Sequence, residues 1–359
     1  MKTSYLAMTG YDGPAPGFEI WPAPSYHCEP SVAVSSVERT LSLCELAEAL
    51  GFDGITVAEH HYAPYMMTPN PMVMAAAITQ RVKRARISLM GPLVPLNNPV
   101  RIAEELAMLD VLSGGRISVM PLRGTPNEHQ TYDTHPEKTR SMTQEGIDLV
   151  IKALQETTPF SWHGENYNYN TISIWPRPVQ AHIPIFGSGN SEESIRFAAE
   201  RRIGIGFSFV PVEIVGDWVE LYRRECARFG WEPTPAHIIY RGIAYLADTD
   251  EAADAGMMAH FGRQKEEQAK LQSETMGGPP LNSLILSKAF FSGSPATVIQ
   301  ICETLSDVGV GMIDTVFSLG SHDEQVNAMK LFASEVIPVI HGWSDTHFAR
   351  SLSPISAVA

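Results

Sequence analysis

The chain has 359 residues, of which 44% are hydrophobic and 18% are charged, as in an ordinary globular protein. Its formal net charge of −14 argues against a general nucleic-acid binder, because such a protein needs a basic surface to neutralise phosphates. The four cysteines are far apart and form no CxxC pair, so neither a disulfide framework nor a zinc cage is expected. Their small number is typical of a reducing compartment, so we expect a cytoplasmic location. No apolar run approaches the roughly 20 residues that cross a bilayer, so no membrane contact is expected.

Short β-rich runs alternate with longer amphipathic runs in the first half of the chain. A strand is expected at 4–9, followed by a Pro- and Gly-rich loop at 10–30 whose length suggests a functional role. A helix at 36–50 has apolar residues at helical spacing, and Gly51 fits its C-terminal end. The elements that follow are strand 52–61, helix 71–82, strand 85–95, helix 99–112, strand 116–122 and helix 138–157.

The second half continues the alternation after one interruption. An aromatic, Asn-rich segment at 160–175 is expected to form a β-hairpin outside the repeat. A less regular stretch at 251–291 separates the seventh strand from the next helix, and residues 346–359 would be a tail attached to a domain at 1–345. The expected elements are strand 183–189, helix 191–201, strand 203–209, helix 212–229, strand 237–247, helix 295–308, strand 311–319 and helix 323–339.

Eight strand–helix repeats without a break in composition favour an α/β fold with parallel strands, because such repeats pair through right-handed crossovers. Eight units can close into a (β/α)8 TIM barrel. An open doubly wound sheet is the alternative, but it usually has fewer strands and a Gly-rich turn after the first one, which the loop after Thr9 lacks. We therefore expect the barrel, with its chemistry on the loops at the carboxyl ends of the strands.

The second strand ends in the segment Ala58-Glu59-His60-His61-Tyr62. Side chains alternate along a strand, so Glu59 and His61 share one face and His60 points the other way. One imidazole can then face the barrel mouth, where it could exchange protons near neutral pH. A pair of structural histidines beside a carboxylate is the alternative. A metal site is less favoured, because the three residues are consecutive and no third cluster with ligand spacing is near.

The ends of the third and fourth strands carry candidate ligand-binding residues. Gly91, after Met90, would let the main chain approach a flat ligand, although a simple turn before Pro92 explains the same residues. Arg123, followed by Gly124, suits a phosphate because its guanidinium is a fork of donors, whereas a surface salt bridge is the alternative.

The fifth strand ends in a glycine- and hydroxyl-containing turn that runs into a helix. Backbone amides and hydroxyls at a helix N-terminus can cradle a phosphate. Asn190 or Ser191 could equally be a plain N-cap. Together with Arg123 on the neighbouring strand, this turn would converge on one anion. The residues of the turn are Ser188, Gly189, Asn190 and Ser191.

Two common catalytic motifs are missing from the sequence. No Gly-x-Ser-x-Gly elbow occurs, which lowers the expectation of a serine hydrolase. No Walker-type Gly-x-x-x-x-Gly-Lys occurs either, so a P-loop nucleotide hydrolase is not expected.

With these motifs, the chain resembles the bacterial luciferase-like flavin monooxygenases over most of residues 1–340. The most specific match is Leu-Asp-x-x-Ser-Gly-Gly-Arg at 109–116 with its spacing to Arg123-Gly124. The other matching segments are Gly51-Phe52-Asp53, Glu59-His60-His61-Tyr62, Asn70-Pro71, Asn98-Pro99-Val100-Arg101, Ala103-Glu104-Glu105 and Gly293-Ser294-Pro295.

The resemblance implies a fold and a set of site residues. It implies a barrel with an insertion after the seventh strand, at 251–291. His60 would be the catalytic histidine, with Glu59 beside it near the flavin. Arg123 and the turn from Ser188 to Ser191 would hold the FMN phosphate. Met90-Gly91 falls where the family has a non-prolyl cis peptide under the flavin ring.

The resemblance also implies an activity. Reduced FMN and oxygen would oxidise an organic, largely apolar substrate, and a separate flavin reductase would supply the reduced FMN, since no nicotinamide fingerprint is visible. A homodimer would form through helices 71–82 and 99–112. The substrate pocket would draw on the insertion and on four aromatic residues, each of which could instead be an ordinary core residue. These four are Trp21, Tyr62, Trp175 and Phe207.

Three other functions remain open on the sequence. A deazaflavin-dependent dehydrogenase on the same barrel would transfer hydride without oxygen. A non-catalytic flavin-binding barrel would store the cofactor. A metal-assisted hydrolase would use Glu59, His60 and His61 as ligands.

Overall fold

The computed structural model describes residues 1–17, 20–271 and 290–343, with the backbone alone described for 261–271. Eight parallel strands make up the centre of the molecule, in the order β4-β3-β2-β1-β11-β9-β8-β7. They are β1 (Lys2–Leu6), β2 (Gly54–Ala58), β3 (Arg86–Leu93), β4 (Ile117–Leu122), β7 (Phe186–Ser188), β8 (Gly204–Ser208), β9 (Ile238–Leu246) and β11 (Met312–Val316).

The two ends of this sheet meet and close it. Val119 of β4 forms a parallel bridge with Ile185, just before β7, and its N–H donates to the carbonyl of Pro184 at 2.9 Å. The expected (β/α)8 barrel is therefore confirmed, and the open doubly wound sheet is excluded.

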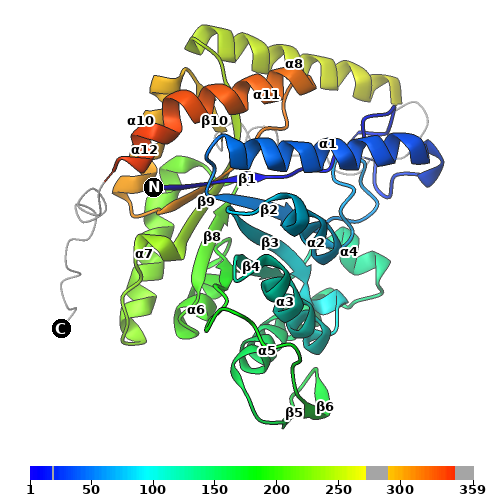
Figure 1. The fold of residues 1–359 in the computed structure, drawn as a ribbon, viewed down its shortest axis with the longest axis vertical. Coiled ribbons are helices and arrows are strands. Elements are labelled where there is room, and N and C mark those ends of the chain that lie inside the picture. The colour runs from blue at the N-terminus through cyan, green and yellow to red at the C-terminus, as the bar shows by residue number, and fades with distance from the viewer. Residues whose placement is uncertain (18–19, 272–289, 344–359) are drawn as a thin grey trace.

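Helices alternate with the strands and surround them (Figure 1). Several begin with the capping chemistry that the sequence contains: Asn70 and Asn98 accept hydrogen bonds from the first turn of the helices that they precede, and a proline follows each. The apolar faces of the helices and the outer faces of the strands form the main hydrophobic core. The helices are α1 (Pro30–Ala49), α2 (Pro71–Arg81), α3 (Pro99–Ser113), α5 (Pro136–Gln155), α6 (Glu192–Glu200), α7 (Val212–Arg228), α10 (Pro295–Asp307) and α11 (His322–Leu331).

The last expected helix, at 323–339, is one helical run with an irregular middle. After α11, a π-helical segment at Phe332–Val336 leads into α12 (Ile337–His341). Pro338 has no N–H to continue the regular helical hydrogen bonds, which fits the irregular segment just before it. The predicted tail at 346–359 lies outside the described residues.

Two segments lie outside the barrel repeat. The predicted hairpin is confirmed as antiparallel strands β5 (Phe160–His163) and β6 (Asn168–Ile172). The insertion after the seventh strand begins with α8 (Asp250–Leu271) and ends with β10 (Phe290–Gly293), which pairs with β9. Figure 1 shows the hairpin and α8 at opposite sides of the molecule.

The first half of the insertion is more regular than expected. Residues 250–271 form one helix because they are rich in Ala, Met, Glu, Gln and Lys, which are good helix formers. They lack the regular apolar stripe by which a helix is recognised from sequence. Residues 272–289 of the predicted insertion lie outside the described part of the chain.

A short helix that the sequence reading did not predict follows β4. Helix α4 (Pro126–Thr131) begins with a capping box. The Thr125 side chain binds the backbone of Glu128, and the Glu128 side chain binds the backbone of Thr125. It brings Glu128 and His129 back over the end of β4, where both side chains are buried. The 3₁₀ turns at Ser25–His27, Val94–Leu96 and Pro235–His237 complete the described helices.

Candidate active site

A pocket of about 460 Å³ opens at the carboxyl ends of β2, β3, β4 and β7, and we call it the mouth pocket. This is the end of the barrel where the sequence predicts the chemistry. Seven sequence-predicted site residues line it: Glu59, His60, Met90, Arg123, Ser188, Asn190 and Ser191. Apolar side chains, including Leu93, Ile147 and Phe197, form much of the remaining wall.

His60 faces the mouth pocket and is paired with a carboxylate. Its Nδ1 lies 3.7 Å from Oε1 of Glu128, which is an ion-pair distance longer than a hydrogen bond. Burial would raise the pKa of Glu128, but the contact with His60 and hydrogen bonds from the N–H and hydroxyl of Thr125 outweigh it and lower the pKa to about 2. Glu128 is therefore a fixed negative charge beside the His60 ring.

Glu59 and His61 lie on one face, as the alternation of a strand predicts, and form a buried hydrogen-bonded pair. Nε2 of His61 is 3.1 Å from Oε1 of Glu59, and the N–H of Leu93 donates to Oε2 at 2.9 Å. The other ring nitrogen of His61 is 3.3 Å from the hydroxyl of Tyr132. His61 does not line the mouth pocket, whereas Glu59 does. The network therefore fixes the Glu59 carboxylate at the pocket wall.

Gly91 makes room for this carboxylate. Its φ is +127°, and a Cβ there would lie 3.0 Å from Cβ of Glu59 and 3.2 Å from its Oε2. The prediction of a cis peptide bond between Met90 and Gly91 is wrong, because the cis bond in this segment joins Gly91 to Pro92. Met90 lines the pocket, and Gly91 lies behind it, against Glu59.

Cationic and hydroxyl groups gather at the other side of the mouth pocket. The exposed guanidinium of Arg123 makes no hydrogen bond or ion pair with any described residue, and Gly124 turns the chain there with a φ of +87°. Arg140 of α5 also lines the pocket and pairs with Glu193 at 2.6 Å. The N-terminus of α6 points its hydroxyl-bearing first turn at the same space, with Ser191 and Ser194 in the lining.

The alternative role of Ser191 as an N-cap is confirmed. Its hydroxyl oxygen accepts from the N–H of Ser194 at 3.2 Å and lies 2.8 Å from the hydroxyl of that residue. Gly189 does not line the pocket. A Cβ at Gly189 would lie 2.5 Å from the ring of Phe207, so this glycine allows close packing of β7 on β8.

Two of the four predicted substrate-binding aromatics lie away from the mouth pocket. Phe207 is fully buried against Trp218. Its neighbours in β8 face the barrel interior, since a Cβ at Gly206 would meet Met120 and the Ser208 hydroxyl accepts from Arg241, so Phe207 faces the helices. Trp175 precedes β7, at the amino end of the barrel, and is 83% exposed. Neither residue is in a position to contact a ligand in this pocket.

The other two aromatics lie together on loops beside the site. The rings of Trp21 and Tyr62 are 6.0 Å apart, and the indole N–H of Trp21 donates to the carbonyl of His61. Neither lines the mouth pocket itself. Their predicted contact with substrate stays a prediction.

Three site residues were missed in the sequence reading. Glu128 sits in the unpredicted helix α4, whose Thr-Pro-x-Glu pattern at 125–128 is a capping-box signal that could have located it. Arg140 and Ser194 carry no motif. Their place in the site follows from the packing of α5 and α6 beside the ends of β4 and β7.

Metal and membrane sites were searched for as well. The described residues contain no group of three or more His, Cys, Asp or Glu side chains able to hold a metal ion, so they do not support the metal-assisted hydrolase. None of the described helices is long and apolar enough to span a bilayer.

The fold and the mouth pocket match one protein family. The family described as luciferase-like monooxygenase matches residues 20–310, so the chain belongs to this family. The alkanal monooxygenase alpha chain of Photobacterium leiognathi is 28% identical over 221 residues, covering 61% of this chain and 62% of the relative. The oxygenase component of the flavin-dependent trigonelline monooxygenase of Acinetobacter baylyi is 24% identical over 223 residues, covering 60% and 61%. The chain thus spans about three fifths of the length of these relatives.

Solved structures of similar fold include both flavin and deazaflavin enzymes. The monooxygenase RslO1 of Streptomyces bottropensis has a TM-score of 0.77 at 23% identity, covering 94% of this chain and 99% of that one. The oxygenating constituent of 3,6-diketocamphane monooxygenase from Pseudomonas putida, in complex with FMN, has a TM-score of 0.73 at 19% identity, covering 94% and 98%. An F420-dependent secondary alcohol dehydrogenase has a TM-score of 0.70 at 15% identity, covering 94% and 98%. At these identities the likeness shows the fold alone.

Proposed function

We propose that this chain is the oxygenase of a two-component flavin monooxygenase, which takes reduced FMN from a separate reductase and uses oxygen to oxidise an organic, largely apolar substrate. The observation that carries the proposal is the unpaired guanidinium of Arg123 in a pocket shared with the hydroxyls of α6 at one side and with His60 at another. An anionic tail and a reactive ring at opposite ends of one ligand match this arrangement.

The residues of the mouth pocket fit FMN. A guanidinium with no partner among the described residues, three serine hydroxyls and a helix N-terminus are donors that a phosphate needs. The volume of about 460 Å³ lies within the range of about 300–1,000 Å³ that is usual for cofactor sites. Arg140 would add charge, although its pairing with Glu193 already neutralises part of it. Arg123, Arg140, Ser188, Ser191 and Ser194 would hold the phosphate.

The remaining groups of the pocket would serve the reaction. Bound reduced FMN would supply the electrons that activate oxygen. His60 would exchange protons at its ring nitrogens, and the Glu128 carboxylate 3.7 Å away would help to orient the ring. Glu59 would fix the wall beside the ring through its bonds to His61 and Leu93. Leu93, Ile147 and Phe197 would exclude water from the reacting atoms.

A decisive experiment compares the binding of reduced FMN to three proteins. Arg123→Gln should raise the Kd for FMN by about tenfold or more, because it removes a charged donor that no other described side chain binds. Arg101→Gln is the matched control, since Arg101 is exposed on α3 and pairs at the surface with Glu104 and Glu105. Equal binding of FMN to wild type and Arg123→Gln would refute the phosphate assignment.

A second candidate is a deazaflavin-dependent dehydrogenase, which the similar fold of the F420-dependent alcohol dehydrogenase favours. Parallel titrations with reduced FMN and with F420 separate the two. Tight binding of F420 alone would replace FMN as the cofactor. Bound FMN without oxygen uptake in any substrate screen would support the non-catalytic flavin-binding barrel.

The proposed partners follow from relatives and from exposed side chains. The trigonelline enzyme is named as an oxygenase component, which supports a separate reductase here as well. Exposed apolar side chains on α2 and α3, among them Val73, Met108 and Val111, support a homodimer through these helices. Sedimentation would test the dimer, and Val73→Glu would be expected to dissociate it.

A further inference from the structure

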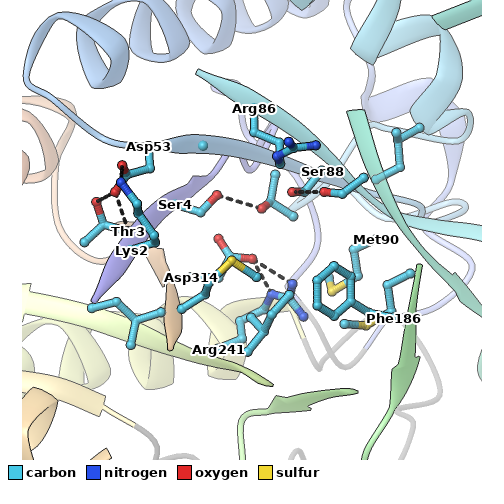
Figure 2. A pocket seen from close by; sticks show the side chains of 18 of the residues that line it. Lys2, Thr3, Ser4, Asp53, Arg86, Ser88, Met90, Phe186, Arg241 and Asp314 are labelled. Atoms are coloured by element: carbon cyan, nitrogen blue, oxygen red, sulfur yellow. Dashed lines mark hydrogen bonds and ion pairs between the residues drawn. The ribbon is translucent and has the colours of Figure 1, made fainter. Parts of the chain in front are cut away.

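A second cavity, of about 310 Å³, lies inside the barrel at the amino ends of the strands, and we call it the inner cavity. Its side chains come from β1, β2, β3, β4, β7, β9 and β11 (Figure 2). Met90 lines both this cavity and the mouth pocket. Met120, Phe186 and Ile239 pack with Met90 in one buried apolar cluster and line the inner cavity, so this cluster separates the two spaces.

The inner cavity exists because the strands place small polar residues where a barrel is usually filled. The interior of a TIM barrel is normally packed with layers of bulky branched side chains. Here, in the layer nearest the amino ends that lies below Met90 and Met120, β1 to β4 contribute Ser4, Thr56, Ser88 and Ser118. They pair as Ser4 with Thr56 at 3.0 Å and Ser88 with Ser118 at 2.7 Å. Each pair uses one O–H in its own bond and leaves the other O–H available to a ligand.

A buried carboxylate oxygen in the inner cavity has no hydrogen-bond donor. Both Nε and Nη2 of Arg241 lie 2.7 Å from Oδ2 of Asp314, and the two side chains are only 3% and 2% exposed. Oδ1 of Asp314 is buried and accepts no hydrogen bond from any described residue. Figure 2 shows Asp314 across the cavity from Ser88, with its dashed bonds directed to Arg241. Leaving such an oxygen unsatisfied is costly, so a donor from outside the chain is expected to fill this place.

The opening of the inner cavity is positively charged. Lys2, Arg84, Arg86 and Arg116 line it, and Lys2 pairs with Asp53 while Arg84 lies 4.0 Å from Glu48. None of the ion pairs among the described residues involves Arg86 or Arg116, which donate to backbone carbonyls. Burial lowers the pKa of both of these arginines, and the nearby carboxylates of Asp110 and Glu48 offset the lost hydration only in part. An anionic group at the opening would supply that compensation.

We propose that the inner cavity is a second ligand site, for a small hydroxy acid. Its hydroxyl donates to Oδ1 of Asp314 and exchanges hydrogen bonds with the serine and threonine pairs, while its carboxylate lies at the cationic opening. The volume of about 310 Å³ admits a small organic molecule. The Met90 side chain also forms part of the wall of the mouth pocket, so this site lies next to the proposed flavin site. The proposal goes beyond the proposed function and does not depend on it.

The first experiment measures the binding of 4-hydroxybutyrate by calorimetric titration and by thermal unfolding. A one-to-one isotherm and a raised Tm are expected at concentrations up to about 10 mM. Butyrate lacks the hydroxyl and butane-1,4-diol lacks the carboxylate, so each should bind about tenfold more weakly or worse. No binding of 4-hydroxybutyrate, or equal binding of butyrate, would overturn the proposal and leave a cavity that holds water alone.

Variants separate this site from the mouth pocket. Arg123→Gln should leave the affinity for 4-hydroxybutyrate unchanged, and a loss there would place the probe in the mouth pocket and overturn the proposal. Lys2→Gln combined with Arg84→Gln should weaken binding by about tenfold, because both exposed cations lie at the opening.

Two further variants complete the test. Arg101→Gln with Lys138→Gln makes the same change in net charge away from the cavity and should bind like wild type. Ser88→Leu fills the cavity and should abolish binding. If Ser88→Leu does not fold, the charge variants still decide, because unchanged affinity in Lys2→Gln with Arg84→Gln would refute the assignment of the carboxylate end.

Discussion

The substitution Glu128→Gln tests the electrostatic reasoning about the mouth pocket. Glu128 is buried, faces His60 and accepts hydrogen bonds from Thr125, and its pKa is lowered from the ordinary 4.5 to about 2. This difference corresponds to about 3 kcal/mol of stability that only the ionised carboxylate provides. Because the pKa in the folded protein is the lower one, this stability is fully present above about pH 4.5. It is lost as the pH falls toward 2.

The assay is urea unfolding of wild type and Glu128→Gln at a series of pH values. The variant keeps the size of the side chain and an oxygen that can accept from Thr125, and it removes the charge. We expect it to be less stable by up to about 3 kcal/mol at pH 7, with a difference that shrinks steadily below about pH 4.5. The control is Glu165→Gln, at the exposed turn of the β5–β6 hairpin, which should change stability by less than about 0.5 kcal/mol.

Two results would refute this reasoning. A variant as stable as wild type at pH 7 would mean that the partners of Glu128 do not outweigh the cost of burying it. A difference of the same size at pH 7 and pH 3 would mean that the substitution acts through packing and not through the charge. In either case the ionised carboxylate of Glu128 would not be the source of the stability assigned to it.

The remaining predictions concern catalysis, backbone strain and acid stability. His60→Ala should lower turnover by about a hundredfold while changing the Kd for FMN little, as steady-state rates and FMN titrations would show. A loss of FMN affinity as large as the loss of turnover would contradict this division of roles. Gly91→Ala should destabilise the fold by about 2 kcal/mol, because φ is +127° and the new Cβ would crowd Glu59; an unchanged Tm would contradict this. Asp53→Asn should lower the Tm at pH 7 and have less effect near pH 3. Burial would raise the pKa of Asp53, but bonds from Lys2 and Thr3 and the nearby His341 lower it, so its stabilising charge is lost as the pH falls. An equal Tm loss at both pH values would argue against that charge.

Local sequence signals located much of the candidate site. The end of each strand is marked by its own residues, so the positions of His60, Arg123 and Ser191 at one rim followed from counting strand–helix repeats and from the rule that parallel strands end on one side. The capping residues Asn70 and Asn98 likewise marked the helix starts. These features depend on neighbours within a few residues, and a sequence displays them directly.

Other features exist only once distant elements pack. The partner of His60 comes from a short helix after β4, and Arg140 reaches the pocket from the middle of α5. Phe207 was expected at the substrate pocket but faces the helices, because alternation along β8 turns Gly206 inward, against Met120. Trp175 was expected there too, but it precedes its strand and lies at the opposite end of the barrel.

By itself the sequence determined the closed barrel, its order of elements and the end of it that carries the chemistry, because hydrophobic period, caps and turns are local properties. Tertiary structure alone decided which side chains meet across the barrel. The inner cavity is the clearest case: Ser4, Ser88 and Asp314 are each unremarkable in the sequence, and only closure of the sheet turns them toward one another. Contacts between strands hundreds of residues apart depend on register and closure, which no short stretch of sequence encodes.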